Sequence, residues 1–219
     1  MTSTIKRITL GLFGIAVATT MLTSCLKDGT YTIVLPLPDG KIPHEVISED
    51  LQDSLDKYGF EIDTGITPPY INGHYLASPM LLDYASDNVV FDFADVDMTF
   101  SKQLERGLIR YIETQNTPNY GSMTSVYENA NIIGSGDKFT MYCSQSDNGD
   151  NTDTNDWKVQ TTTVISGTWV EGVGIKNCQY AVLIRQKVYD SGNRIPVDTT
   201  TTFRIFHDGD GMAEMLTAK

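Results

Sequence analysis

The stretch NCQYAVLIR, residues 177–185, is the clearest indication of the fold class of this chain. On an extended backbone, Cys178, Tyr180, Val182 and Ile184 share one face of the stretch. A period of two is typical of a β-strand that turns one face toward a core, and β-branched and aromatic residues favour the same structure. The same alternation occurs in two more segments, KFTMYCS (138–144) and WKVQTTT (157–163).

Strand-like segments of this kind fill the chain from residue 71 onward. Turn residues separate eight of them, at 71–84, 89–100, 106–115, 122–133, 138–146, 157–168, 174–189 and 198–207. The connections are mostly short, which makes successive strands antiparallel neighbours. Closing such a sheet removes its two edges. We therefore predict an all-β fold, an eight-stranded antiparallel up-and-down barrel, with an open two-sheet sandwich as the alternative.

One segment before the strands has a helical pattern instead. Apolar side chains recur at helical spacing within residues 43–58, in one stripe made of Ile47, Leu51, Leu55 and Tyr58. A proline at the start, acidic residues near the first turn and a glycine after the end suit the polarity of a helix. We expect this helix to lie half-buried against the main fold, where it could plug one mouth of the barrel.

The N-terminus has the layout of a secretory signal peptide. Residues 1–24 contain Lys6 and Arg7, an apolar run at 8–18, and small residues that lead to Cys25. The apolar run is too short to span a bilayer, which takes about 20 residues. One interpretation of this layout is an ordinary signal peptide, cleaved close to a cysteine that stays unmodified.

The residues before the cysteine favour a second interpretation, because Leu22-Thr23-Ser24-Cys25 resembles the bacterial lipobox. The resemblance implies that Cys25 carries a diacylglyceryl thioether and, after cleavage, a further acyl chain, which together anchor a protein durably. Leu26 implies the outer membrane, on its periplasmic face or at the cell surface. The predicted division is then a signal peptide (1–24), a lipidated cysteine with its tether (25–42) and one barrel domain with its helix (43–219). Within the tether, 31–40 is an edge strand or an extended linker.

Charge and length limit the partners. Without residues 1–24 the chain has 195 residues, with 14 basic against 28 acidic side chains and a net charge of about −14. Such a surface repels phosphate backbones, so we expect no nucleic-acid partner. We expect contact with the membrane through the lipid anchor, and the sequence identifies no protein partner.

Two further cysteines lie in strand segments. Cys143 and Cys178 both fall on apolar phases, with one predicted strand between them. Next-nearest strands are about 9–10 Å apart, too far for an undistorted disulfide. We expect two buried free thiols, although the predicted compartment permits disulfides.

No pattern in the chain predicts catalysis, a metal or a cofactor. His44, His74 and His207 are scattered, whereas zinc needs three or four convergent ligands. The glycine-rich GSGD (134–137) and DGDG (208–211) suit turns, the acidic loop 146–156 lacks the glycine and glutamate of an EF-hand, and Asp92, Asp95 and Asp97 suit a solvated strand face.

Several stretches resemble known proteins. Ile71-x-Gly73-x-Tyr75 is similar to the opening of the lipocalin and calycin barrels, with Tyr75 where lipocalins prefer tryptophan. A group of uncharacterised lipoproteins from gut-dwelling Gram-negative anaerobes is similar over most of the mature chain, at 68–79, 134–139, 165–168, 174–181 and 208–214. The resemblance implies a calycin-like barrel, and some members carry a lipid-binding label.

An eight-stranded barrel holds either side chains or one small ligand. The apolar phases place six side chains toward the lumen, namely Tyr75, Phe139, Met141, Trp157, Tyr180 and Val182. We therefore expect non-enzymatic binding of a small apolar or lipidic ligand, with a filled barrel that serves as a structural or interaction module of an envelope complex as the alternative.

Overall fold

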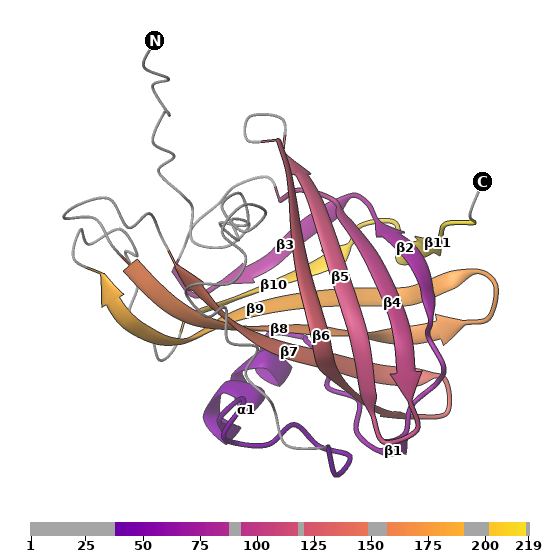
Figure 1. The fold of residues 1–219 in the computed structure, drawn as a ribbon, viewed down its shortest axis with the longest axis horizontal. Helices are drawn as coiled ribbons and strands as arrows, with labels where there is room; N and C mark the ends of the chain where they lie inside the picture. Colours follow the sequence, from indigo (N-terminus) through magenta and orange to yellow (C-terminus); the bar gives the residue numbers. More distant parts are fainter. Residues whose placement is uncertain (1–37, 88–92, 118–120, 149–156, 191–201, 218–219) are drawn as a thin grey trace.

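The computed structural model describes residues 38–87, 93–117, 121–148, 157–190 and 202–217 (Figure 1). The predicted signal peptide, Cys25 and residues 31–37 of the tether fall outside this part. The described elements are one helix, α1 (Glu49–Lys57), and the strands β1 (Ile66–Thr67), β2 (Gly73–Ala77), β3 (Met80–Ala85), β4 (Val96–Leu104), β5 (Leu108–Thr117), β6 (Gly121–Ser135), β7 (Lys138–Asn148), β8 (Trp157–Val170), β9 (Gly174–Asp190), β10 (Phe203–Asp208) and β11 (Met212–Met215).

The strands close into an eight-stranded antiparallel barrel, so the predicted fold class is confirmed. Around the wall the order is β2, β4, β5, β6, β7, β8, β9 and β11, and β11 returns to β2. β10 and β11 follow one another along the same edge of β9, at Gln179–Leu183 and Gly174–Lys176 respectively. β3 pairs with β10 as β2 pairs with β11. Two of the eight positions in the wall are therefore each occupied by two short consecutive strands, β2 with β3 and β10 with β11.

The differences from the predicted strands are local. The expected strand 71–84 divides at Ser78-Pro79, because proline has no N–H group to donate to a ladder. The expected strand 89–100 begins only at Val96, although its residues 89–92 fall outside the description. β1, which pairs parallel to the end of β6, and β11, after the turn at 208–211, were not predicted.

The helix is shorter than predicted and lies outside the barrel. Residues 44–47 form a turn, with the N–H groups of Val46 and Ile47 both donating to the carbonyl oxygen of Pro43. Ser48 has an extended backbone, so α1 begins at Glu49 rather than at residue 43. The helix packs on the outer wall and does not plug a mouth, whereas its expected half-buried position is confirmed because Leu55 is fully buried.

The wall between β7 and β10 is therefore covered on both faces. Its outward side chains pack under the N-terminal segment in a cluster that contains Ile47, Leu55, Phe60, Tyr142, Val164, Ala181, Leu183 and Ile205. Side-chain contacts fix the segment at several places. The Gln179 side chain accepts a hydrogen bond from the Glu61 N–H at 2.8 Å and donates to the Gly59 carbonyl at 2.7 Å, and Arg185 donates to the Glu45 carbonyl.

The two ends of the barrel differ. At one end the hairpins are tight, and we call this the short-turn end; its connections are 105–107, 136–137 and 171–173. At the other, the loop end, three connections are longer, at 86–95, 149–156 and 191–202, and the fourth, 118–120, is short. β6 pairs with β7 only over Asn131–Ser135, next to the short-turn end. Toward the loop end the two strands diverge, and no described strand joins their facing edges (Figure 1).

Cys143 and Cys178 are both buried free thiols, as predicted. Cys143 lies on β7 and Cys178 on β9, with β8 between them. Burial, and secondarily the charge of Asp208, raises the pKa of the Cys178 thiol to about 12, so this thiol stays protonated and unreactive at neutral pH.

Candidate functional site

The candidate site is the barrel lumen, and the structure places five of the six predicted lining residues in it. Tyr75, Phe139, Met141, Tyr180 and Val182 belong to one buried cluster inside the barrel. Trp157 is the first residue of β8, and its side chain lies outside the described part. These residues do not line one common space, however, because the two halves of the lumen differ in packing and in polarity.

The short-turn half is filled by apolar and aromatic side chains. Phe100 stacks on Tyr111 with ring centroids 5.0 Å apart, and Tyr111 stacks on Tyr127 at 5.5 Å. Tyr75 meets Phe100 edge to face at 5.9 Å, and its hydroxyl accepts a hydrogen bond from the Trp169 indole. Phe139 and Met141 are also 0% exposed. Three of the predicted lining residues, Tyr75, Phe139 and Met141, therefore belong to a packed core.

Among the described residues, the carboxylate, amide, serine and threonine side chains that face the lumen lie in the loop-end half. On β5 the inward positions change from Ile109 and Tyr111 to Glu113 and Gln115. On β6 and β8 the same change occurs, and the inward polar set of the loop-end half is Glu113, Gln115, Ser125, Thr161 and Thr163. A core that serves only to fill the barrel needs no polar side chains, because burying them costs free energy unless they are hydrogen-bonded.

A tyrosine–carboxylate bridge crosses the lumen where the two halves meet. The hydroxyls of Tyr111 and Tyr180 donate to the same carboxylate oxygen of Glu113, at 2.8 and 2.9 Å. Glu113 lies on β5 and Tyr180 on β9, four positions apart around an eight-stranded wall and so on opposite sides. Burial and then the nearby Glu113 raise the pKa of both tyrosines well above their ordinary value, so both hydroxyls remain protonated donors at neutral pH.

The loop-end half is slightly less buried than the short-turn half. Val182, Glu113 and Thr161 are 8%, 8% and 9% exposed, whereas the residues of the aromatic stack are 0–4% exposed. Phe93, just before β4, lies against Phe206 with ring centroids 4.0 Å apart and against Tyr180 at 6.0 Å. Apolar contacts from Phe93, Val159, Val182 and Ile184 therefore lie beside the inward polar set.

The other predicted residues do not assemble a site among the described residues. His74 pairs with Asp97 at 2.6 Å and His207 with Asp83 at 2.7 Å, both on the outer surface. The Asp95 carboxylate accepts a hydrogen bond from the Ser78 hydroxyl, so Asp95 and Asp97 serve different partners. His44 is a surface residue beside Glu45, and Asp92 and most of the loop 146–156 fall outside the description.

The two glycine-rich motifs are turns, as predicted. GSGD (134–137) contains the last two residues of β6 and the 136–137 turn to β7. DGDG (208–211) contains the last residue of β10 and the turn to β11, in which the Gly211 N–H donates to the Asp208 carbonyl. Asp208 is the structural centre of its turn, because its carboxylate also accepts from the N–H groups of Ser78, Asp210 and Met212. No group of three or more potential metal ligands occurs in the described part of the chain.

Comparison with protein-family models, curated proteins and solved structures finds no match for this chain. No described helix is long and apolar enough to cross a membrane. Sequence reasoning missed Glu113 and the polar set around it, although the alternation in RYIETQ (110–115) places Tyr111, Glu113 and Gln115 on one face.

Proposed function

We propose that this chain is a lipid-anchored outer-membrane protein that binds a small ligand, without catalysis, in the loop-end half of its barrel. The observation that carries the proposal is the polarity change inside the lumen, from a packed aromatic core to a wall of mixed polar and apolar side chains. Cys25 supplies the anchor in this proposal, with the barrel on the periplasmic face of the outer membrane or at the cell surface.

The composition of the loop-end wall indicates the class of ligand. Val182, Ile184, Val159 and Phe93 offer apolar contact, and the inward polar set offers hydroxyl, amide and carboxylate groups. Binding sites for small molecules commonly combine apolar walls with a few polar groups that orient the ligand. We propose an amphipathic ligand of lipidic type, with its apolar part against the aliphatic side chains and its polar end near Glu113 or Gln115.

The diverging edges of β6 and β7 supply a second support for this proposal. The inward residues beside this divergence include Ser125 on β6 and Cys143 on β7. A ligand that parts these two strands would break no ladder hydrogen bond between described residues, because the β6–β7 ladder ends at Asn131 and Tyr142. In this proposal an elongated ligand would enter the loop-end half by separating these two strands.

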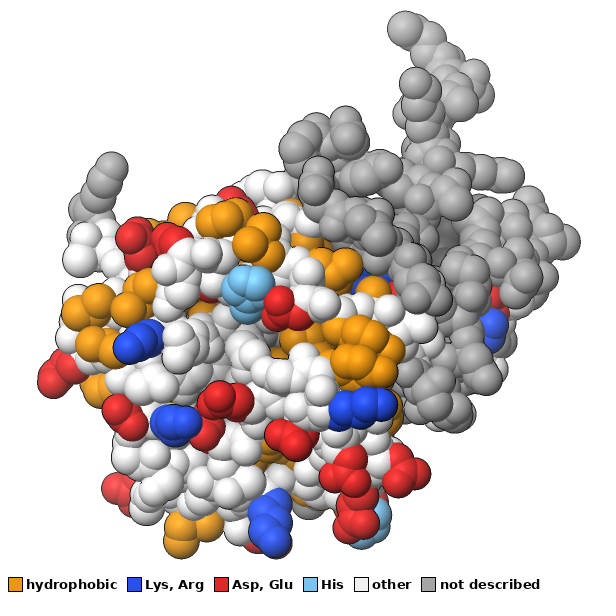
Figure 2. Space-filling model, turned by 180° about the vertical axis from the view of Figure 1, so that it is seen from behind, with side chains coloured by type: hydrophobic (Ala, Val, Ile, Leu, Met, Phe, Trp, Pro, Cys, Tyr) orange, Lys and Arg blue, Asp and Glu red, His pale blue; other side chains and the backbone are white. Residues whose placement is uncertain are grey.

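A second function is favoured by the short-turn half. Its fully packed core is what a structural or interaction module would have, and such a module needs no ligand. Exposed apolar side chains, which a partner would cover, are present but dispersed. Figure 2 shows several separate hydrophobic groups among charged side chains on one face, rather than one continuous patch. For this reason the ligand-binding function is preferred.

Titration of the mature protein with a fluorescent fatty acid tests the proposal. We expect saturable binding by the wild type and loss of binding in Val182→Trp, which fills the loop-end half. Val188→Trp is the matched control, because Val188 lies on the same strand and is 44% exposed on the outside. Glu113→Gln, which is close to isosteric, should change the affinity while the near-ultraviolet circular dichroism stays native. Absence of saturable binding by the wild type would favour the interaction module.

A further inference from the structure

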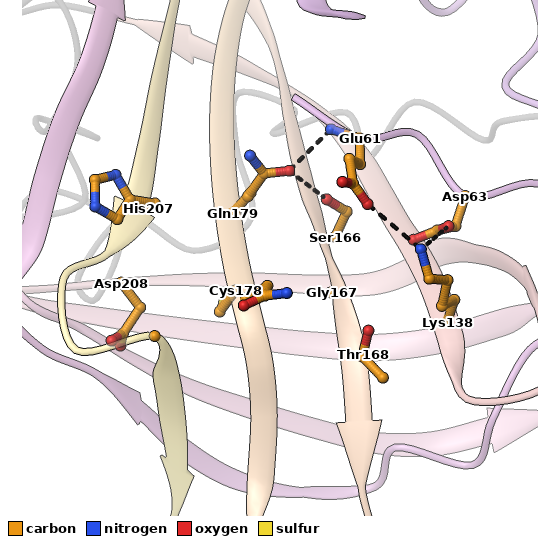
Figure 3. Close-up of a pocket in the computed structure, with 12 residues that line it drawn as sticks. Glu61, Asp63, Lys138, Ser166, Gly167, Thr168, Cys178, Gln179, His207 and Asp208 are labelled. Carbon is orange, nitrogen blue, oxygen red and sulfur yellow. Dashed lines mark hydrogen bonds and ion pairs between the residues drawn. The ribbon is translucent and has the colours of Figure 1, made fainter. Parts of the chain in front are cut away.

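A cleft of about 380 Å³ lies on the outer wall, away from the lumen (Figure 3). Lys138 on β7, Ser166 and Thr168 on β8, Gln179 on β9 and His207 on β10 line it. Glu61 and Asp63 of the N-terminal segment form one side and Asp208 the opposite side. Its volume falls within the range of small-molecule sites, about 300–1,000 Å³.

The cleft follows a line of breaks in neighbouring strands. The β8–β9 ladder shifts register between Ser166 and Thr168, and Asn177 opposite has a left-handed backbone with φ of 51°. A Cβ atom on Gly167 would lie 2.6 Å from the Ile175 side chain, so only glycine allows the strands to approach here. β10 gives way to β11 at 208–211, beside the same point of β9. Bulges of this kind are frequent next to binding sites.

Part of the cleft wall is rigidly held. Both ends of the Gln179 amide bind the backbone of the N-terminal segment, and Lys138 forms ion pairs with Glu61 at 3.4 Å and Asp63 at 3.7 Å. Asp208 is held by its three backbone donors. These groups fix the shape of the cleft and have little capacity left for a ligand.

Three other polar groups are available. Within the described part of the chain, the Thr168 hydroxyl and the Asn177 amide make no side-chain hydrogen bond, and His207 uses only its Nδ1 atom, toward Asp83. They lie on the adjacent strands β8, β9 and β10 and line the same cleft. A hydroxyl, an amide and an imidazole nitrogen together can donate and accept hydrogen bonds.

We propose that this cleft is a second binding site, for a small neutral hydroxyl-rich molecule of the saccharide class. An anion is disfavoured, because Glu61, Asp63 and Asp208 outnumber the one lysine of the lining. An apolar ligand is disfavoured, because the lining contains no large aliphatic side chain and no phenyl, phenol or indole ring. Without such a ring to stack on a sugar, the affinity should be in the millimolar range, about 4 kcal/mol of binding free energy.

The test is a titration of the isotope-labelled mature protein with the methyl glycosides of glucose, galactose and N-acetylglucosamine, each to about 50 mM, well above a millimolar dissociation constant. We expect saturable amide shifts at Thr168, Asn177 and Gln179 with at least one glycoside. Thr168→Val removes the hydroxyl at constant shape, and Asn177→Gly removes the amide and still permits the left-handed backbone. Each should weaken binding about fivefold to tenfold. Thr99→Val, on the opposite wall, should leave it unchanged.

Three outcomes would overturn the proposal. They are no saturable shift with any of the three glycosides, shifts centred on another surface, or equal affinity in the wild type and both cleft variants. The Val182→Trp variant separates this site from the lumen, because it should abolish fatty-acid binding and leave glycoside binding intact. The two proposals therefore fail independently.

Discussion

Removing the Tyr180 hydroxyl, by Tyr180→Phe, tests the bridge across the lumen. The ring and its apolar contacts remain, and the 2.9 Å hydrogen bond to the Glu113 carboxylate is lost, together with the hydrogen bond that the hydroxyl makes with the Thr163 side chain. A hydrogen bond to a charged group contributes about 1.5–3 kcal/mol to stability. Because Tyr180 is 3% exposed, solvent cannot replace the donor. We therefore expect the free energy of unfolding to fall by about 1.5–3 kcal/mol.

Urea denaturation of the mature protein measures this change. The midpoint should fall while the slope of the transition stays the same, which shows that the surface exposed on unfolding is unchanged. Tyr70→Phe is the control, because Tyr70 is 60% exposed and its loss should alter stability by less than about 0.5 kcal/mol. If Tyr180→Phe were as stable as the control, the bridge between opposite walls through the Glu113 carboxylate would be refuted.

Three further predictions concern the anchor, the thiols and the pH dependence of stability. Cys25→Ala should move the protein from the membrane to the soluble fraction, and unchanged pelleting would contradict lipid anchoring. Mass spectrometry after alkylation under denaturing, non-reducing conditions should find Cys143 and Cys178 both modified, and a mass two units lower without alkylation would show a disulfide. Burial raises the pKa of Asp208 from 3.8 to about 6, so the folded state holds this proton more tightly than the unfolded state. Stability should therefore fall, relative to Asp208→Asn, as the pH rises from about 4 to 7; parallel pH profiles of the two proteins would refute the shift.

The barrel was predictable because one face of each strand points into the core and the other points outward, which gives the sequence an alternating pattern. The alternation in 138–144 and 178–184 indicated strands, and the short turns indicated antiparallel neighbours. The burial of the outer face of the wall was harder to predict, because its sign in the sequence is only the uninterrupted apolar run AVLI (181–184). Ala181 and Leu183 face the N-terminal segment, whereas Val182 and Ile184 face the lumen. A strand covered on both faces loses its alternation.

The position of the helix was not predictable from its amphipathic pattern. That pattern shows which stripe is buried, and it cannot show whether the stripe meets a mouth or a wall. The contacts that decide the matter, from Gln179 and Arg185, join residues more than a hundred positions apart in the chain.

The polarity of the lumen was missed for a related reason. On β5 the outward Ile112 is apolar while the inward Glu113 and Gln115 are polar, so hydrophobicity suggests the wrong face at this point. Only the barrel closure brings Tyr180 from the opposite wall to the Glu113 carboxylate. Sequence patterns fail where a buried position is polar, and such positions are expected at functional sites.

Ligand binding in the barrel is tested most simply by native mass spectrometry of the protein released gently from its own envelope. We expect a protein ion heavier than the lipidated chain by one small molecule, with that extra mass lost on denaturation and recovered by organic extraction. Val182→Trp should carry no such molecule, whereas Val188→Trp should carry it. A wild-type protein that shows no extra mass and binds no fluorescent fatty acid would contradict ligand binding in the loop-end half of the barrel.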